Sequence, residues 1–93
     1  MALVPHTEWS IDSSVRYLNH GSYGADPREV TAAQQLIREQ MEHNPNQFVR
    51  SHLPTMLRAA RARCATELGT VEDRFAFVPN ASQGVIAAAG AVV

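Results

Sequence analysis

The chain has 93 residues, 45% of them apolar, which suits one small domain with a modest core. Its formal net charge of -1 arises from eight arginines and nine acidic residues, and it gives no electrostatic reason to expect nucleic acid or an anionic membrane as a partner. The opening Met1 to Trp9 lacks the pattern of a secretory signal, and no stretch is apolar over the length of a membrane span, so we expect a cytoplasmic location.

The segment from Trp9 to Gly24 predicts a short strand and then a tight loop. The apolar run from Val15 to Leu18 forms the strand, and Gly21 and Gly24 give the following loop backbone freedom that other residues lack. This loop brings four polar groups close together: the amide of Asn19, the imidazole of His20, the hydroxyl of Ser22 and the phenol of Tyr23. Such a set suits a ligand-facing loop, although the same side chains can instead serve only the local backbone.

Residues 27–70 predict two amphipathic helices. Asp26, Pro27 and Glu29 form a helix-start pattern, with an acidic cap, a proline at the first helical position and an acid that closes a capping box. The helix is expected to end at about His43 or Asn44, because Pro45 disfavours helical geometry in the residue before it. Its apolar residues recur at three- and four-residue steps: Val30, Ala33, Ile37 and Met41.

A linker or a single turn is expected over residues 46–51, before the second helix. Gly69 is placed to terminate that helix. Arg58, Arg61 and Arg63 fall largely off its apolar side and are expected to be solvated, with Arg63 and Glu67 spaced for a weak surface pair. The apolar side carries Leu53, Leu57, Ala60, Cys64 and Leu68.

The last part of the chain predicts a buried strand over Phe75 to Val78, a small polar turn, and then a helix or strand meant for burial over Gln83 to Val93. A strand, a polar turn and an apolar helix form an anion-binding layout, because a helix start presents unpaired N–H groups and a partial positive charge. Ser82, Gln83 and Gly84 are the candidate phosphate donors. The same turn is also a common helix cap.

The remaining reactive side chains do not form a recognisable centre. The four histidines show no helical pair and no cysteine or acid at ligand spacing, so no metal site is predicted. Cys64 has no base near it in the sequence and is expected to act as a small hydrophobe. The exposed apolar tail suggests that the chain is part of a larger protein.

Three segments together resemble the class V aminotransferases, and within them the isopenicillin N epimerase-like branch, which is related to cysteine desulfurases and hercynylcysteine sulfoxide lyases. The segments are Tyr17 to Gly24 with Pro27 after it, Asn44-Pro45 with Phe48, and Glu72-Asp73 leading into Val78 to Ser82. The resemblance spans roughly Trp9 to Val85.

The resemblance implies an α/β fold: the N-terminal piece of a fold-type I enzyme that uses pyridoxal 5′-phosphate, mostly helical here with one or two short strands. It implies an N-terminal arm and active-site loop over 1–26, two helices over 27–70, and the start of the cofactor-binding domain over 71–93. It also implies a homodimer when complete. The family's phosphate turn falls on Asn80, Ala81, Ser82 and Gln83, where threonine is more usual at the Ser82 position, and its substrate loop falls on Asn19, His20, Gly21 and Ser22.

One departure from the family decides what these residues can do. Such enzymes bind the cofactor covalently through a lysine and place an acid beside its ring nitrogen, and this chain contains no lysine. In the family both groups lie downstream of the phosphate turn, whereas Asp12, Asp26 and Asp73 precede it. No catalytic residue is therefore assigned, and the 93-residue chain alone is expected to be inactive.

Two functions remain open at this point. The longer parent is expected to act on an amino-acid-like substrate by epimerisation, transamination or elimination. The alternative is a small helical module without a catalytic role, which binds a protein through the face of Leu53, Leu57 and Leu68 or through the apolar tail.

Overall fold

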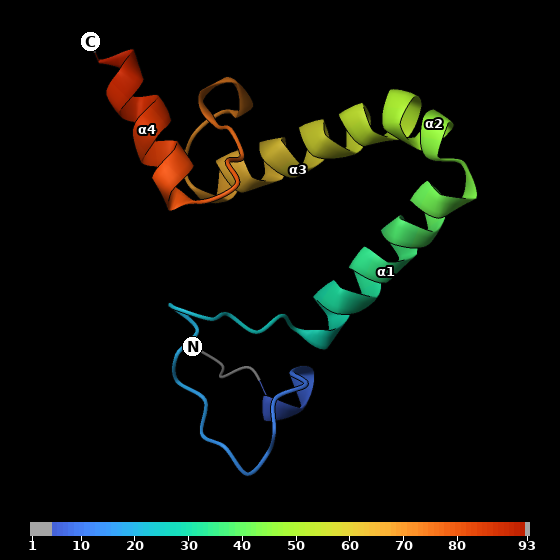
Figure 1. Ribbon diagram of the computed structural model, residues 1–93, viewed down its shortest axis with the longest axis vertical. Helices are drawn as coiled ribbons and strands as arrows, with labels where there is room; N and C mark the ends of the chain where they lie inside the picture. Colours follow the sequence, from blue (N-terminus) through green and yellow to red (C-terminus); the bar gives the residue numbers. More distant parts are fainter. Residues whose placement is uncertain (1–4, 93) are drawn as a thin grey trace. The chain divides into compact units, whose positions relative to one another are not determined.

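The computed structural model describes residues 5–92, which form helices joined by turns and extended segments (Figure 1). The chain divides into two compact units, Met1–Phe48 and Val49–Val93. The first unit contains the short 3₁₀ helix η1 (His6–Glu8), α1 (Arg28–His43) and the short α2 (Pro45–Gln47). The second contains α3 (Leu53–Glu67), the 3₁₀ helix η3 (Glu72–Arg74) and α4 (Ala81–Ala91), and the π-helical turn η2 (Phe48–His52) spans the boundary.

The expected α/β fold is wrong for this chain, because residues 5–92 contain neither a strand nor a sheet. The predicted strands over 15–18 and 75–78 are irregular segments. Phe75 does have extended backbone angles, with φ of -130° and ψ of 136°. A strand also needs a neighbour to pair its N–H and C=O groups, and neither segment has one. The β pairing in the described part of the chain is an isolated antiparallel bridge between Trp9 and Pro27.

Helix α1 ends where the sequence predicts but begins differently. It stops at His43. Asn44, which precedes Pro45, is no longer helical, with φ of -152° and ψ of 85°. At the other end Pro27 is the N-cap, with an extended ψ of 148° and no capping side chain, so the predicted capping box of Asp26 and Glu29 is wrong. Pro27 takes the N-cap position because its backbone is held extended in the bridge to Trp9.

Residues 46–51 are helical, which corrects the expected linker. Asn44 caps α2 by accepting a hydrogen bond from the Gln47 N–H at 3.1 Å, and Pro45 occupies the first turn, where its missing N–H costs nothing. The chain then continues through η2 directly into α3. The wide π-helical turn lies where Pro54 cannot donate to the carbonyl of Arg50 and its ring crowds that carbonyl.

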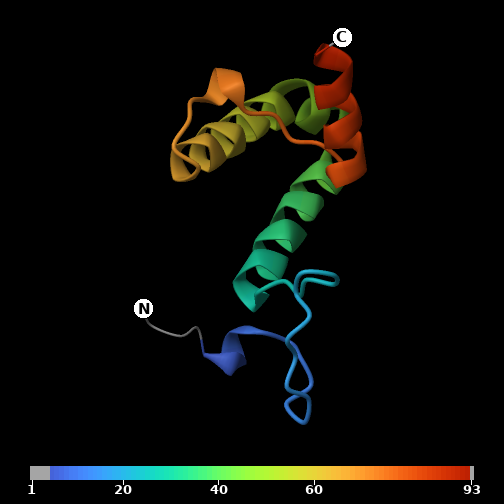
Figure 2. The same ribbon diagram turned by 90° about the vertical axis from the view of Figure 1, so that its left-hand side faces the viewer.

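Gly69 terminates α3, as predicted. Its φ of +73° is the left-handed conformation that glycine adopts without a steric penalty. The Gly69 N–H donates to the Thr66 carbonyl at 3.1 Å, and the Thr70 N–H donates to the Ala65 carbonyl at 2.9 Å, which together form a Schellman motif. The chain can then turn back, and both Figure 1 and Figure 2 show the segment with η3 lying along the end of α3, where the two elements pack together.

The buried core is very small. Among the described residues only Phe48 and Ala65 are buried, with 3% and 0% of their surface exposed. The tail is helical as far as Ala91 and its apolar residues are exposed, Val85 at 67% and Ile86 at 64%, while Val93 lies outside the described residues. None of the helices in 5–92 combines the length and the apolar character that a membrane crossing requires.

Candidate functional site

The predicted phosphate turn lies at the start of α4, and Asn80 organises it. Asn80 is the N-cap residue in an extended conformation, and its side-chain Oδ1 accepts a hydrogen bond from the Gln83 N–H at 2.9 Å. The Asn80 carbonyl accepts from the Gly84 N–H at 3.2 Å. Two of the three amides named from the sequence, those of Gln83 and Gly84, are therefore engaged by Asn80 itself.

The donors that remain at this turn belong to Ala81 and Ser82. Within residues 5–92, neither of their N–H groups forms a hydrogen bond, as expected for the first turn of a helix. The Ser82 side chain is exposed, so its hydroxyl can donate to a ligand. Two amides, one hydroxyl and the positive end of an eleven-residue helix are thus available to an anion at the same turn.

The predicted substrate loop is a tight turn closed on Asn19. The Asn19 carbonyl accepts hydrogen bonds from the N–H groups of Ser22 at 3.3 Å and Tyr23 at 3.0 Å. The His20 Nδ1 accepts from the Ala25 N–H at 3.3 Å, which assigns the ring proton of the neutral imidazole to Nε2. The side chains of Asn19 and Ser22 and the outer edge of His20 are exposed and can contact a ligand.

Aromatic contacts hold this loop in place. The His20 ring lies between two others, with ring centroids 5.4 Å from Trp9 and 4.8 Å from Tyr17, the latter edge-to-face. The Tyr17 hydroxyl donates to the Tyr23 carbonyl. A Cβ at Gly24 would lie 3.3 Å from the His20 carbonyl, so a small residue suits this close approach. These contacts give the loop a defined conformation within the first unit.

The two predicted sites belong to different units, and each is described by itself. The substrate loop lies in Met1–Phe48 and the phosphate turn in Val49–Val93. No group of three histidine, cysteine or acidic side chains in the described chain is arranged to hold a metal ion. Cys64 is a half-buried free thiol.

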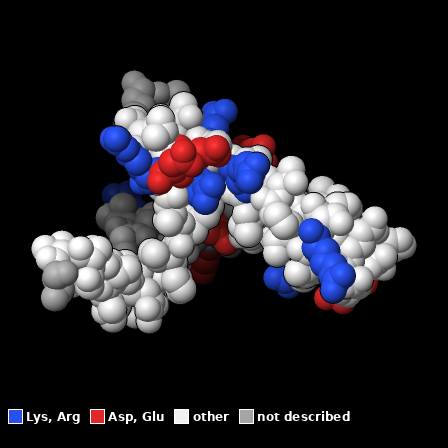
Figure 3. Space-filling view, turned by 90° about the horizontal axis from the view of Figure 1, so that it is seen from above, with Lys and Arg blue, Asp and Glu red and all other residues white. Residues whose placement is uncertain are grey.

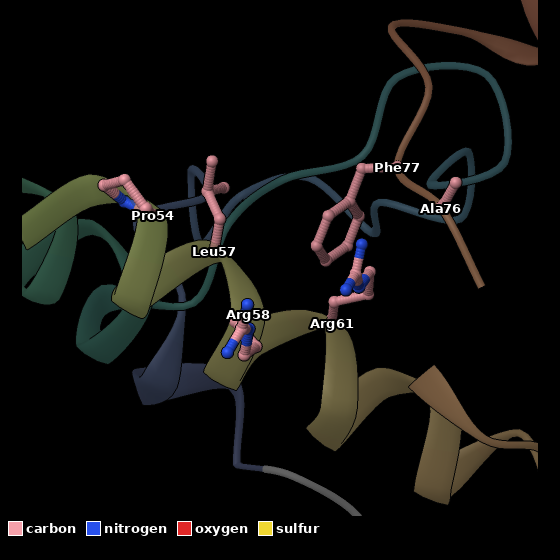
Figure 4. A pocket seen from close by; sticks show the side chains of 6 residues that line it. All are labelled: Pro54, Leu57, Arg58, Arg61, Ala76 and Phe77. Carbon is pink, nitrogen blue, oxygen red and sulfur yellow. The ribbon is translucent and has the colours of Figure 1, made fainter. Parts of the chain in front are cut away.

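The second unit also contains a groove that the sequence did not predict. Its volume is about 430 Å³, and Figure 4 shows the side chains that line it: Pro54, Leu57, Arg58, Arg61, Ala76 and Phe77. Two of the three arginines expected to be solvated line this groove. The spacing of Arg58 and Arg61 on one helix was a usable signal. The sequence does not show that residues 76 and 77 return to α3.

Arg63, the third of these arginines, is exposed as the sequence predicts, and so is Arg58. Arg63 forms a surface ion pair with Glu67, with its Nη2 3.0 Å from the Glu67 Oε1 and both side chains largely exposed. On the face shown in Figure 3, arginine and acidic side chains are interspersed and form no broad patch of one sign.

Comparison with known proteins indicates a relation to one enzyme. The chain is 37% identical over 83 residues to isopenicillin N epimerase from Amycolatopsis lactamdurans. The aligned stretch covers 89% of this chain but 21% of the epimerase, so the chain spans about a fifth of the length of that relative. No family model matches the chain, and no solved structure is significantly similar to it.

Proposed function

We propose that this chain is the N-terminal part of a pyridoxal-phosphate-dependent enzyme of the class V aminotransferase type, acting on an amino-acid-like substrate as an epimerase, lyase or desulfurase. The observation that supports it is the similarity to isopenicillin N epimerase, which extends over 83 residues and includes the α4 turn. The complete protein is a cytoplasmic homodimer under this proposal, with no nucleic acid or membrane partner.

The residues at the α4 turn fit the phosphate end of this cofactor. The N–H groups of Ala81 and Ser82 and the Ser82 hydroxyl are unengaged donors, and the helix start adds a favourable field. Asn80 holds the turn in shape, and Gln83 contributes through its side chain, because its N–H is already bound to Asn80.

The residues do not fit the other end of the cofactor. When bound, pyridoxal phosphate supplies an electron sink for bond cleavage beside the substrate nitrogen. The amine that would anchor it is absent, because the chain has no lysine. The chain therefore contributes binding and shape, and we assign it no catalytic residue.

The loop from Asn19 to Ser22 forms a wall of the substrate site in this proposal. Asn19 offers an amide, Ser22 a hydroxyl, and His20 an Nε2–H whose direction is fixed by the Ala25 N–H and by the flanking rings. These groups suit the carboxylate and amine of an amino-acid-like molecule.

Replacing Ser82 tests the proposed cofactor role directly. In the longer parent, Ser82→Ala is expected to weaken affinity for pyridoxal phosphate by about 1 to 2 kcal/mol, the scale of a charge-assisted hydrogen bond. Ser82→Thr keeps the hydroxyl and is expected to retain the affinity of the unmodified protein. Ser51→Ala, which removes an exposed serine of η2, is the matched control. Equal cofactor retention in Ser82→Ala and the control would remove Ser82 from the phosphate site.

A second candidate, a helical module that binds another protein, is favoured by the exposed apolar side chains of α3 and its end. Leu57 is 50% exposed and Leu68 72% exposed. A segment that packs inside a larger enzyme exposes the same residues when viewed alone, and the similarity to the epimerase is the observation that favours the enzyme. A reading frame that continues past Val93 into alternating strands and helices with a lysine supports the enzyme, and a stop there supports the module.

A further inference from the structure

The groove in the second unit combines apolar walls with two positive charges. Pro54 and Leu57 of α3 and Phe77 of the returning segment supply the walls. Arg58 and Arg61 lie three residues apart on α3, so both guanidinium groups reach the same side of the helix. Figure 4 shows the Phe77 ring and the Arg61 side chain pointing toward one another.

Arg61 is held in place without a polar partner. Its Nε is buried and has no hydrogen-bond partner in the described chain. An enclosed, unpaired N–H is unfavourable unless a nearby group compensates for it, and a guanidinium carries a full charge that also needs compensation. Because the Nε side is covered, the Nη nitrogens are the donors that Arg61 can offer to the groove.

No acidic side chain of the described residues compensates these charges. None lines the groove, and the ion pair on this helix joins Arg63 to Glu67 instead. Arg58 also lines a smaller cavity of about 160 Å³ together with Pro54 and Thr55. A ligand that matches the groove therefore carries a negative charge for the two arginines and an apolar body for the walls.

We propose that this groove binds a small carboxylate with an aromatic or aliphatic body. The carboxylate lies between Arg61 and Arg58 and accepts paired hydrogen bonds from the Nη nitrogens of Arg61, which match a carboxylate in geometry. The body lies against Leu57 and the Phe77 ring, which is 52% exposed and so available for stacking. A volume near 430 Å³ falls in the range of small-molecule sites.

The test is a titration of the ¹⁵N-labelled 93-residue chain with 3-phenylpropionate, followed by NMR at the Arg61 Nε–H and at backbone amides of residues 57–61 and 76–77. We expect saturable shifts at these positions with an affinity on the order of millimolar. Acetate, which lacks the apolar body, and 3-phenylpropanamide, which lacks the charge, are expected to bind at least about tenfold more weakly.

Two arginine variants test whether Arg61 binds the carboxylate. Arg61→Gln is expected to weaken 3-phenylpropionate binding by at least about tenfold, whereas Arg63→Gln, an exposed arginine of the same helix, keeps it within about twofold. Equal binding of the amide, or equal binding by Arg61→Gln and Arg63→Gln, overturns the proposal, as does the absence of shifts near Arg61. The amide comparison uses the unmodified chain, so it holds even if a variant unfolds. The signals of Ala81 and Ser82 report the phosphate turn separately.

Discussion

Asp12 shows how one neighbour sets the acidity of a surface side chain. The Ser14 N–H donates to the Asp12 Oδ1 at 2.9 Å and the Ser14 hydroxyl donates to the same oxygen at 2.7 Å. These bonds, the backbone one first, hold the pKa of the Asp12 carboxyl below its usual range. A depressed folded-state pKa stabilises the fold at pH values above the usual carboxyl pKa, and this contribution is lost as the pH falls through the folded value.

Removing the Ser14 hydroxyl is therefore expected to raise the pKa of Asp12. In Ser14→Ala the backbone N–H still donates, so the pKa rises only part of the way to its usual range. NMR titration of the Asp12 carboxyl carbon measures this, with Ser13→Ala as the neighbouring control. An unchanged pKa in Ser14→Ala would mean that the hydroxyl contact does not persist in solution.

Gly69 is the residue whose backbone angles matter most for the second unit. Alanine at this position must adopt a φ near +73°, which is expected to cost about 1 kcal/mol of unfolding free energy. Gly90→Ala is the contrasting variant, since it lies in α4 with open space at its Cβ and gains helix propensity of up to about 1 kcal/mol. Thermal melts followed by circular dichroism test the pair. A Gly69→Ala chain as stable as the unmodified one would argue against the Schellman end of α3.

At the scale of elements, Asn80 decides how α4 begins. Asn80→Ala removes the acceptor for the Gln83 N–H and is expected to destabilise the helix by about 1 kcal/mol, while Asn80→Asp keeps an acceptor and largely retains its stability. Amide hydrogen exchange at Gln83 is the direct measurement. Faster exchange is expected in Asn80→Ala, and unchanged exchange would show that another group holds this amide.

The elements that the sequence predicted well are those with local signals. Pro45 marks the end of α1, and Gly69 ends α3, because each acts on residues adjacent to it. The strands over 15–18 and 75–78 failed because pairing depends on a neighbour that local composition cannot supply. The capping box failed because Pro27 is held in the bridge to Trp9, a contact between residues far apart in the sequence.

The same distinction applies to the candidate site. A polar turn followed by a helix or strand from Gln83 onward was predicted from local order, and the structure has a helix there, α4, which begins two residues earlier at Ala81. The sequence did not reveal that Asn80 engages the Gln83 and Gly84 amides and leaves those of Ala81 and Ser82 as donors. The arginine groove was missed because it forms only when residues 76 and 77 return to α3.

At the scale of the whole molecule, the chain has little with which to stabilise itself. Two residues of the described chain are buried, Phe48 in the first unit and Ala65 in the second, which is far less burial than its apolar composition allows. Most of its large apolar side chains remain exposed, including Leu18 at 83%. This balance agrees with a segment whose partners lie in the remainder of a longer enzyme, as proposed from the similarity to isopenicillin N epimerase.

The most direct test of the proposed function compares two ligands that differ only in a phosphate. The ¹⁵N-labelled chain is titrated with pyridoxamine 5′-phosphate and with pyridoxamine, neither of which needs a lysine to bind. Phosphate binding at the start of α4 predicts amide shifts at Ala81 and Ser82 with the phosphorylated ligand and none there with pyridoxamine. Equal shifts with both ligands, or shifts with the phosphate that spare Ala81 and Ser82, would contradict it.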